Sequence, residues 1–437
     1  MHAVRKSLSV GYSSGSRETV QPVVWRLLDV KSFASQVTTG SAARKHQSFK
    51  YDDLEIVQSK KLGKKPDWNK LVFGHNFSDH MLSIPWSETK GWDAPRIGPL
   101  KNIELHPAAK VLHYAIELFE GLKAYRGVDG RIRLFRPDQN MKRMNSSARR
   151  SGLPEFDGNE LLRCMAQLIE LDSSWVPQSP ESSLYIRPTM IGNDPTLGVS
   201  RSKECLLYVI SGPVGPYFPT GLKPVSLLAD PSFVRSWPGS AGAFKMGSNY
   251  APTILVGKEA EKQGCQQVLW LYGEDHQLTE VGTMNIAAYW TNENGEKELV
   301  TPPLNGLILP GVTRTSLLEL AREWGVFKVT EKNITMKDII KSIKEKRLIE
   351  LFGAGTACVI CPISRLLYLG RDIHIPVPVE GGDSVSRRFY NELLDIQYGR
   401  KAHPWAVDIE DLIQGTSTSA EVHEVAEPRR QKVAARI

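Results

Sequence analysis

The chain is organised around Ser240-Ala-Gly-Ala-Phe-Lys245-Met-Gly-Ser-Asn-Tyr250-Ala-Pro252. Lys245 stands among glycines and other small residues, and Tyr250 follows five positions later. Glycine lets the backbone turn tightly around a bulky group, which leaves one amine and one phenol to face that group. A lysine that is desolvated in such a turn has a lowered pKa and can form a Schiff base with an aldehyde. The alternative is a surface lysine in a glycine-rich loop, so the rest of the chain must decide between the two.

The composition predicts a soluble globular protein of two or three domains. The chain has 437 residues, of which 41% are hydrophobic and 24% charged. It contains no apolar run long enough for a membrane span. Its formal charge of +7 raises the question of nucleic acid, but there is no interleaved basic and aromatic tract and no zinc pattern. We therefore expect no nucleic acid, membrane or metal partner.

The two ends differ in composition from the body of the chain. Residues 1–50 are basic and rich in Ser and Thr, and their only acids are Glu18 and Asp29. This composition is typical of organellar transit peptides, and the alternative is a disordered cytosolic extension. We therefore expect a mitochondrial protein, with a cytoplasmic one as the alternative. Residues 411–437 are polar with mixed charge and predict a flexible tail.

The body of the chain predicts two mixed α/β domains. Alternating residues indicate strands at 131–136, 183–187, 205–210, 267–272 and 286–290, and helical periodicity indicates helices at 159–171 and 313–324. A capping sequence at Thr335–Asp338 begins a further helix. The glycines and prolines from Gly212 to Gly221 predict a linker. The expected division is a small N-terminal domain at 51–211, a linker at 212–222 and a larger domain at 223–410.

Three fragments after Lys245 could complete a site for pyridoxal phosphate. This cofactor needs an acid beside its pyridine nitrogen and a site for its phosphate. Glu280 stands just before a predicted strand. Gly311 precedes the helix at 313–324, whose first backbone amides would form an anion site. Thr356 adds a hydroxyl in the small-residue turn Gly353–Ala357.

Taken in order, these fragments resemble the branched-chain amino acid aminotransferases. The resemblance rests on Tyr114-Ala-Ile-Glu-Leu-Phe-Glu-Gly-Leu-Lys-Ala-Tyr-Arg126, Leu184-Tyr-Ile-Arg-Pro188, Lys245–Tyr250, Glu280-Val-Gly-Thr-Met-Asn285, Leu309-Pro-Gly-Val312 and Gly355-Thr-Ala-Cys-Val-Ile-Cys361. It extends from about Trp68 to Trp405. It implies a fold-type-IV pyridoxal phosphate enzyme, usually a homodimer, with the cofactor enclosed between a small and a large domain.

The resemblance also implies roles for individual residues. Lys245 matches the Schiff-base lysine, which moves the proton during the reaction, and Tyr250 matches the phenol at the 3-oxygen of the cofactor. Glu280 matches the acid at the pyridine nitrogen. The phosphate-binding positions are matched by Arg143, Val312, Thr313 and Thr356, and the positions that bind the substrate α-carboxylate by Thr283 and Ala357.

The implied substrates are leucine, isoleucine and valine with their 2-oxo acids, and glutamate with 2-oxoglutarate. One site must therefore accept an aliphatic side chain and a carboxylate in turn, and an extra methylene alters binding by only about 1–3 kcal/mol. Arg187 matches the donor to the distal carboxylate of glutamate. The pocket is matched by Phe73, Tyr114, Phe119 and Tyr185, and a loop lent to the partner subunit by Leu197 and Val199.

Cys358 and Cys361 form a CxxC pair. Animal members of the family carry this pair as a peroxide-sensitive switch, and we expect the same here, with inert buried thiols as the alternative. The chain has five cysteines, too few for a disulfide framework in a chain of this size, so a reducing compartment is expected.

Other activities remain open within and outside this fold. A D-amino acid aminotransferase would differ in substrate stereochemistry, and a lyase would release ammonia or pyruvate. A non-catalytic nucleic-acid-binding or redox scaffold would form no adduct between Lys245 and a cofactor.

Overall fold

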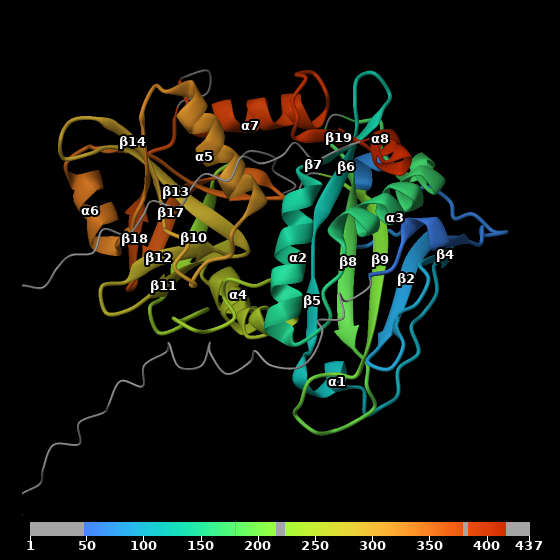
Figure 1. Cartoon of the computed structure of the whole chain (residues 1–437). Coiled ribbons are helices and arrows are strands. Elements are labelled where there is room, and N and C mark those ends of the chain that lie inside the picture. The colour runs from blue at the N-terminus through green and yellow to red at the C-terminus, as the bar shows by residue number, and fades with distance from the viewer. Residues whose placement is uncertain (1–47, 180, 216–222, 379–382, 417–437) are drawn as a thin grey trace, which may run out of the picture. The chain divides into compact units, whose positions relative to one another are not determined.

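The computed structural model describes residues 48–179, 181–215, 223–378 and 383–416. Most of the predicted transit extension at 1–50, and residues 417–437 of the predicted tail, lie outside the described residues. Within the described range, no helix has both the length and the apolar character that a membrane span requires. Two mixed β-sheets, one built mainly from each half of the chain, organise the fold (Figure 1).

The first sheet is formed mainly by the N-terminal half of the chain. Its two longest strands pair antiparallel along their whole length, from Ser183 opposite Val214 to Gly192 opposite Cys205. In spatial order its strands are β1 (Glu55–Ile56), β4 (Arg96–Pro99), β2 (His80–Ser87), β9 (Glu204–Val214), β8 (Ser183–Gly192), β6 (Leu122–Arg126), β7 (Ile132–Phe135) and β19 (Ala406–Asp408), with β3 (Gly91–Trp92) beside β2 and β5 (Glu117–Phe119) beside β8.

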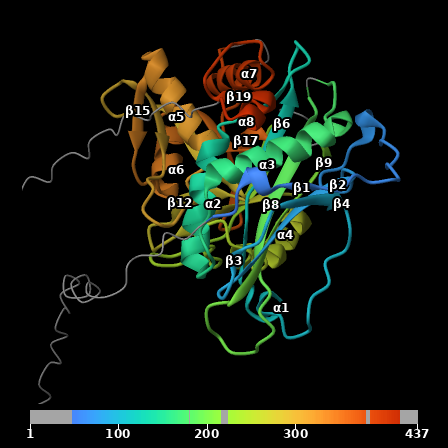
Figure 2. The ribbon, with the colours of Figure 1, turned by 45° about the vertical axis from the view of Figure 1, so that its right-hand side comes forward.

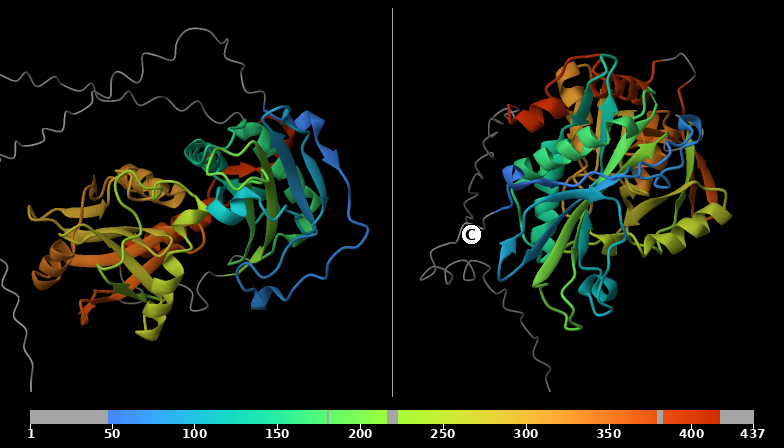
Figure 3. Two further views of the ribbon diagram at one scale, coloured as in Figure 1. Left: turned by 90° about the horizontal axis from the view of Figure 1, so that it is seen from below. Right: turned by 90° about the vertical axis from the view of Figure 1, so that its right-hand side faces the viewer.

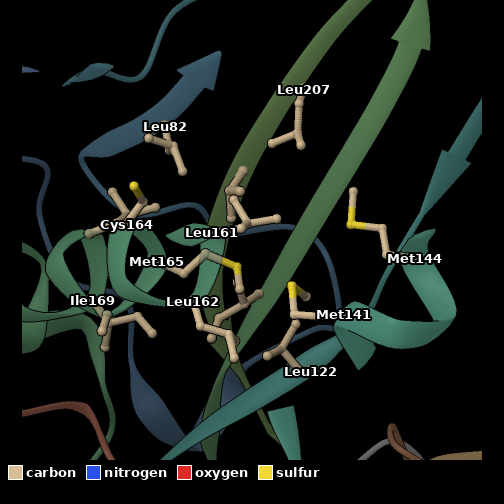
Figure 4. Packing of buried hydrophobic residues seen from close by; sticks show 14 of the residues in the cluster. Leu82, Leu122, Met141, Met144, Leu161, Leu162, Cys164, Met165, Ile169 and Leu207 are labelled. Carbon is tan, nitrogen blue, oxygen red and sulfur yellow. The ribbon is translucent and has the colours of Figure 1, made fainter. Parts of the chain in front are cut away.

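Helices α2 (Pro137–Ser151) and α3 (Gly158–Leu171) pack on this sheet. Figure 2 shows α3 lying across β8 and β9. The helical face predicted for 159–171 is confirmed, because Leu161, Met165 and Leu168 are fully buried. Figure 4 shows how Leu161 and Met165 approach Leu82 and Leu207 of the strands. This core fixes α2, which carries Arg143 toward the second half of the chain.

The second sheet is formed by the C-terminal half. In spatial order its strands are β12 (Gln277–Val281), β11 (Gln267–Tyr272), β10 (Val225–Ala229), β17 (Val359–Tyr368), β16 (Leu348–Gly355), β13 (Met284–Thr291), β14 (Lys297–Thr301) and β15 (Lys328–Glu331), with β18 (Arg371–His374) beside β17. The remaining helices are α1 (Lys110–Tyr114), α4 (Thr253–Lys262), α5 (Val312–Trp324), α6 (Met336–Lys344), α7 (Val385–Gln397) and α8 (Ile409–Gln414), and short 3₁₀ turns lie at Tyr51–Asp53, Trp68–Lys70, Ser173–Trp175 and Gly247–Asn249.

Helix boundaries in this half follow the predicted local chemistry. Thr335 and Asp338 form the predicted capping box of α6, with the Thr335 hydroxyl accepting from the Asp338 N–H and the carboxylate accepting from the Thr335 N–H. Helix α5 ends at Gly325, whose left-handed φ of 63° suits glycine. The strands predicted at 267–272 and 286–290 are also present.

The domain boundaries of the described residues differ from the predicted ones at two points. Gly212 does not begin a linker but continues β9, and an added Cβ there would lie 1.9 Å from the Asn76 carbonyl oxygen. Glycine is needed at this position because the segment around Asn76 passes so close to the strand. The glycine therefore marks a close approach of two segments, and the start predicted for the linker is wrong here. Residues 216–222 of the predicted linker lie outside the described residues.

The second difference concerns the end of the chain. Strand β19 pairs antiparallel with β7, and α8 packs against α3, so the segment 406–414 rejoins the first sheet (Figure 3). Arg133 Nε lies 3.1 Å from Asp408 Oδ1 and reinforces this pairing. The predicted boundary at residue 410 therefore falls inside α8 rather than at the start of a tail.

Candidate active site

A cavity of about 590 Å³ is lined by residues of both sheets and of the loops between them. The structure brings most of the predicted site residues to this cavity. They are Phe73, Phe119, Arg143, Tyr185, Arg187, Lys245, Tyr250, Glu280, Thr283, Val312, Thr313, Thr356, Ala357 and Cys358. The predicted residues that do not line it are Tyr114, Leu197, Val199 and Cys361.

Lys245 is fixed in the cavity by its backbone. Its N–H donates to the Ser147 hydroxyl of α2 over 3.0 Å, and its carbonyl accepts from the Phe119 N–H over 3.0 Å. Its Nζ lies 5.0 Å from the centre of the Phe119 ring. Burial, and then the nearby Arg143 guanidinium, lower the pKa of Lys245 to about 7. A large fraction of this amine is therefore neutral near pH 7 and able to act as a nucleophile or a base.

Glu280 is the buried acid of the cavity, at the end of β12. Its Oε1 accepts from the Leu309 N–H at 3.0 Å and from Asn285 Nδ2 at 3.3 Å. Its Oε2 lies 2.7 Å from Arg235 Nη1, but within the described residues neither of these two atoms has a well-directed hydrogen bond. Burial raises the pKa of Glu280, and Arg235 opposes that increase. Oε2 is therefore an oriented acceptor that a buried N–H group could use.

Arg143 and the start of α5 lie together at one corner of the cavity. The Arg143 guanidinium donates to both carboxylate oxygens of Glu120, at 2.7 and 2.8 Å, and to the Pro310 carbonyl at 3.0 Å. Burial alone would raise the pKa of Glu120, but Arg143 lowers it below its usual value. Helix α5 begins after Gly311, which provides no side-chain cap, so the first amides at Val312 and Thr313 have no partner from a capping side chain.

An aromatic wall with one embedded guanidinium forms another side of the cavity. The Phe73 and Tyr185 rings meet edge to face with centroids 4.9 Å apart. Arg187 donates to the Tyr185 hydroxyl over 2.9 Å, and its guanidinium carbon lies 4.5 Å from the centre of the Phe119 ring. Arg187 Nε is buried without a hydrogen-bond partner in the described part of the chain. This wall offers both apolar surface and a donor for a carboxylate.

The remaining predicted site residues are Tyr250, Tyr114 and the loop that contains Leu197 and Val199. The Tyr250 ring packs against Phe119 with centroids 5.0 Å apart, and burial raises the pKa of its phenol to about 12. Tyr114 donates from its hydroxyl to the Leu197 carbonyl, so its hydroxyl is directed to the loop rather than into the cavity of its own chain. On that loop, Leu197 is 61% exposed and Val199 83% exposed.

The CxxC pair lies at the turn from β16 to β17. Cys358 faces the cavity, and its Sγ lies 3.0 Å from the Met284 Sδ. Cys361 is buried in β17. Burial raises the pKa of Cys358 to about 12 and also raises that of Cys361. Because the thiolate is the reactive form, these surroundings favour inert thiols over the predicted switch.

Several residues of the site were not predicted from the sequence. Arg235 carried no signal, since a single arginine in a loop has no pattern. Glu120 and Asn285 stood inside the motifs quoted for the resemblance, but no role was assigned to them. Their place inside those motifs, beside residues that were given roles, is a signal that could have drawn attention to both.

Comparisons with known proteins place this geometry in context. The family described as class IV amino-transferases matches residues 117–366. The chain is 53% identical over 390 residues to the mitochondrial branched-chain-amino-acid aminotransferase of Bos taurus, covering 89% of this chain and 96% of that one. It is 56% identical over 363 residues to the cytosolic branched-chain-amino-acid aminotransferase of Rattus norvegicus, covering 83% and 88%.

Solved structures resemble the fold as well. The branched-chain amino acid aminotransferase of Escherichia coli superposes with a TM-score of 0.60 and 24% identity, covering 75% of this chain and 99% of that one. The branched-chain amino acid aminotransferase of Thermobaculum terrenum, solved in its PLP form, gives a TM-score of 0.60 and 19% identity, covering 76% and 99%. The predicted mixed α/β, fold-type-IV architecture is therefore confirmed.

Proposed function

The chain belongs to the class IV aminotransferase family, and we propose that it is a branched-chain-amino-acid aminotransferase that uses pyridoxal 5'-phosphate. It would transfer an amino group reversibly between leucine, isoleucine or valine and 2-oxoglutarate. The observation that carries the proposal is the joint presence, in one cavity, of a lysine with a pKa lowered to about 7, a buried carboxylate and an aromatic wall with an embedded arginine. A surface lysine or a non-catalytic scaffold gives no physical reason for that combination.

The residues of the cavity fit the cofactor. Glu280 Oε2 is a buried acceptor without a directed hydrogen bond in the described residues, which suits a protonated pyridine nitrogen. Arg143, the first amides of α5 and the Thr356 hydroxyl suit a dianionic phosphate. When bound, the cofactor supplies an aldehyde for the amino group and a ring that withdraws electrons from the substrate α-carbon.

The protein's own residues would hold and move the proton. Lys245 Nζ would take the proton from the substrate α-carbon, because burial keeps a large part of this amine neutral near pH 7. Arg235 would keep Glu280 ionised, so that the pyridine nitrogen holds its proton. The Tyr250 hydroxyl, with a pKa of about 12, would remain a hydrogen-bond donor throughout.

The same wall would accept both kinds of substrate. Phe73, Phe119 and Tyr185 offer apolar surface to an aliphatic side chain. Arg187 would bind the distal carboxylate of glutamate with its guanidinium, while its stem and the ring beneath it remain compatible with leucine. Thr283 and Ala357, which also line the cavity, would receive the substrate α-carboxylate.

The proposed function is tested with purified protein supplied with pyridoxal phosphate, L-leucine and 2-oxoglutarate. We expect glutamate and the 2-oxo acid of leucine to form in equal amounts, and no ammonia. The Lys245→Ala variant should lose activity by at least about 10³-fold, whereas Lys262→Ala, an exposed lysine on α4, should match the wild type. Conversion of D-leucine only, or release of ammonia, would refute the proposal in favour of the two alternative activities.

We further propose a homodimer in which the loop with Leu197 and Val199 enters the partner's site. The two side chains are exposed on the single chain, and an exposed apolar loop tip that Lys110 anchors from beneath is suited to a partner. Sedimentation should show a dimer. The double variant Leu197→Asp/Val199→Asp should lower the activity, and a monomeric wild type with full activity would contradict this arrangement.

The location is a proposal, and the redox switch stays a prediction that the burial of both thiols disfavours. Relatives of similar identity include mitochondrial and cytosolic proteins, and we propose the mitochondrion on the composition of residues 1–50. Protein recovered from organelles with an intact Met1 would count against a cleaved transit peptide. If activity lost to peroxide does not return with a thiol reductant, or Cys358→Ala is equally sensitive, the switch is excluded.

A further inference from the structure

Lys123 is a buried cation for which the family resemblance gave no role. It lies on β6, its side chain is almost entirely buried, and within the described residues it forms no ion pair. Lysine is rarely buried without a carboxylate partner, since the loss of hydration is costly. Burial lowers the pKa of Lys123 to about 8, so most of this amine still carries its proton at pH 7. Such an uncompensated charge is a feature that an incoming anion would stabilise.

The contact that Lys123 makes connects it with the candidate active site. Its Nζ donates to the Ala357 carbonyl over 2.8 Å. Ala357 belongs to the turn Gly355–Cys358, which lines the large cavity, and it comes from the other sheet. Lys123 therefore lies behind the turn, and the bond fixes the orientation of the Ala357–Cys358 peptide group.

The surroundings of Lys123 leave its charge available. It lines a second cavity of about 10 Å³, room for about one water molecule, together with Asn140 of α2 and Gln397 of α7. No carboxylate lines this space. Cys358 and Tyr125 lie near Lys123, and burial raises the pKa of both, so both are neutral near pH 7. The Glu120 carboxylate accepts from Asn140, but its charge is already paired with Arg143. The positive charge has no counter-ion there.

We propose that Lys123 is a positioning residue for substrate binding: from behind, it holds the Gly355–Cys358 turn, and its charge favours the substrate carboxylate that binds on the cavity side of that turn. This inference rests on the proposed function and extends it to a residue that does not itself line the large cavity. A cation placed behind a row of small residues strengthens anion binding without blocking the space that the substrate needs. The same charge could favour the cofactor phosphate, so the experiment separates the two anions.

The test measures binding by calorimetry, with 4-methylvaleric acid as a carboxylate that carries no amino or oxo group to react. The holoenzyme is compared with Lys123→Met, Lys123→Gln and Lys123→Arg, and with Lys262→Met as an exposed control. We expect Lys123→Met to weaken binding by about 10- to 100-fold, since it removes a charged hydrogen bond. Lys123→Arg should recover most of the affinity, and Lys123→Gln, which keeps a donor without the charge, should recover less.

Kinetics and cofactor binding provide the remaining readouts. The KM for leucine should rise with the calorimetric Kd, while kcat changes by less than about threefold and the affinity of the cofactor-free protein for pyridoxal phosphate stays within about twofold. Wild-type binding in Lys123→Met, a loss confined to kcat, or a loss confined to the cofactor would overturn the inference. If Lys123→Met does not fold, the affinities of Lys123→Arg and Lys123→Gln for 4-methylvaleric acid are compared instead. Tighter binding by Lys123→Arg supports the inference, and equal binding by the two variants overturns it. A wild type that does not transaminate leucine would instead refute the proposed function.

Discussion

Removal of Arg235 should destabilise the protein and weaken the cofactor site. The side chains of Arg235 and Glu280 are 4% and 3% exposed, and their charged atoms lie 2.7 Å apart. Loss of one partner of a buried ion pair leaves the other charge uncompensated, which costs about 3–5 kcal/mol. For the Arg235→Met variant in a chain of 437 residues this corresponds to a decrease in Tm of roughly 3–6 °C. Part of the penalty is avoided when Glu280 takes up a proton instead.

That proton uptake gives the prediction a pH dependence. Burial raises the folded-state pKa of Glu280 above its unfolded value, and the loss of Arg235 would raise it further. A carboxyl group with a raised folded pKa contributes stability that is present at low pH and lost as the pH rises through that pKa. The difference in Tm between wild type and Arg235→Met should therefore be small near pH 5 and widen toward pH 8.

The assay is thermal unfolding, followed by circular dichroism at several pH values, together with titration of pyridoxal phosphate into the cofactor-free protein. The double variant Arg235→Met/Glu280→Gln removes both charges and should recover at least half of the lost stability at pH 8, although cofactor affinity stays low. If the stability losses of Arg235→Met and of a Glu280→Gln single variant simply add in the double variant, or if the Tm difference does not change with pH, the reasoning about this pair is refuted.

Three further perturbations test the site and the fold. In cofactor-free protein, the rate at which Lys245 reacts with an acylating reagent, followed by mass spectrometry, should be half-maximal near pH 7; a midpoint near 10 would contradict its burial. Gly121→Ala would place a Cβ 2.1 Å from the Tyr185 hydroxyl, so the aromatic wall must shift. We expect this shift to lower the stability by about 1–3 kcal/mol and to raise the KM for leucine. The control is Gly98→Ala, where the added Cβ meets nothing within 4 Å, and it should change neither the stability nor the KM. Thr335→Ala removes the helix cap and should lower the stability by about 1 kcal/mol in chemical unfolding while kcat stays unchanged; a loss of activity at full stability would contradict a purely structural role.

Local structure was predictable wherever a short pattern decides it. The buried face of α3 follows from helical periodicity, and the start of α6 follows from two side chains that satisfy each other's backbone groups. Gly212 shows the limit of such patterns. Glycine marks either a turn or a close approach of another segment, and only the position of Asn76 decides which applies. The return of residues 406–414 to the first sheet was equally hidden, since pairing between β7 and β19 joins segments far apart in the chain.

In the site, too, some residues could be predicted from the sequence, whereas others depend on contacts between distant segments. Lys245, Tyr250 and Glu280 were assigned because the resemblance carried them, and spacing alone would not have brought Glu280 near Lys245. The residues that set the charge and orientation of the site side chains could not be assigned in this way. Arg235 lies in a loop without pattern and acts through a single buried contact, and Glu120 acts by orienting Arg143. Their roles depend on three-dimensional proximity and desolvation, which no local sequence pattern records.

The charge balance around the cavity explains why one site would serve several anions. Two of its cations are already neutralised, Arg143 by Glu120 and Arg235 by Glu280. Arg187, Lys123 and Lys245 form no ion pair within the described residues, and they lie around the space in which the cofactor and substrate would meet. The unpaired arginine is suited to a distal carboxylate and the unpaired Lys123 to an α-carboxylate, whereas Lys245 reduces the cost of burial by giving up its proton. The excess of positive charge would thus favour anionic substrates, and the Arg143 guanidinium adds to the effect of burial, which is the main cause of the lowered pKa of Lys245.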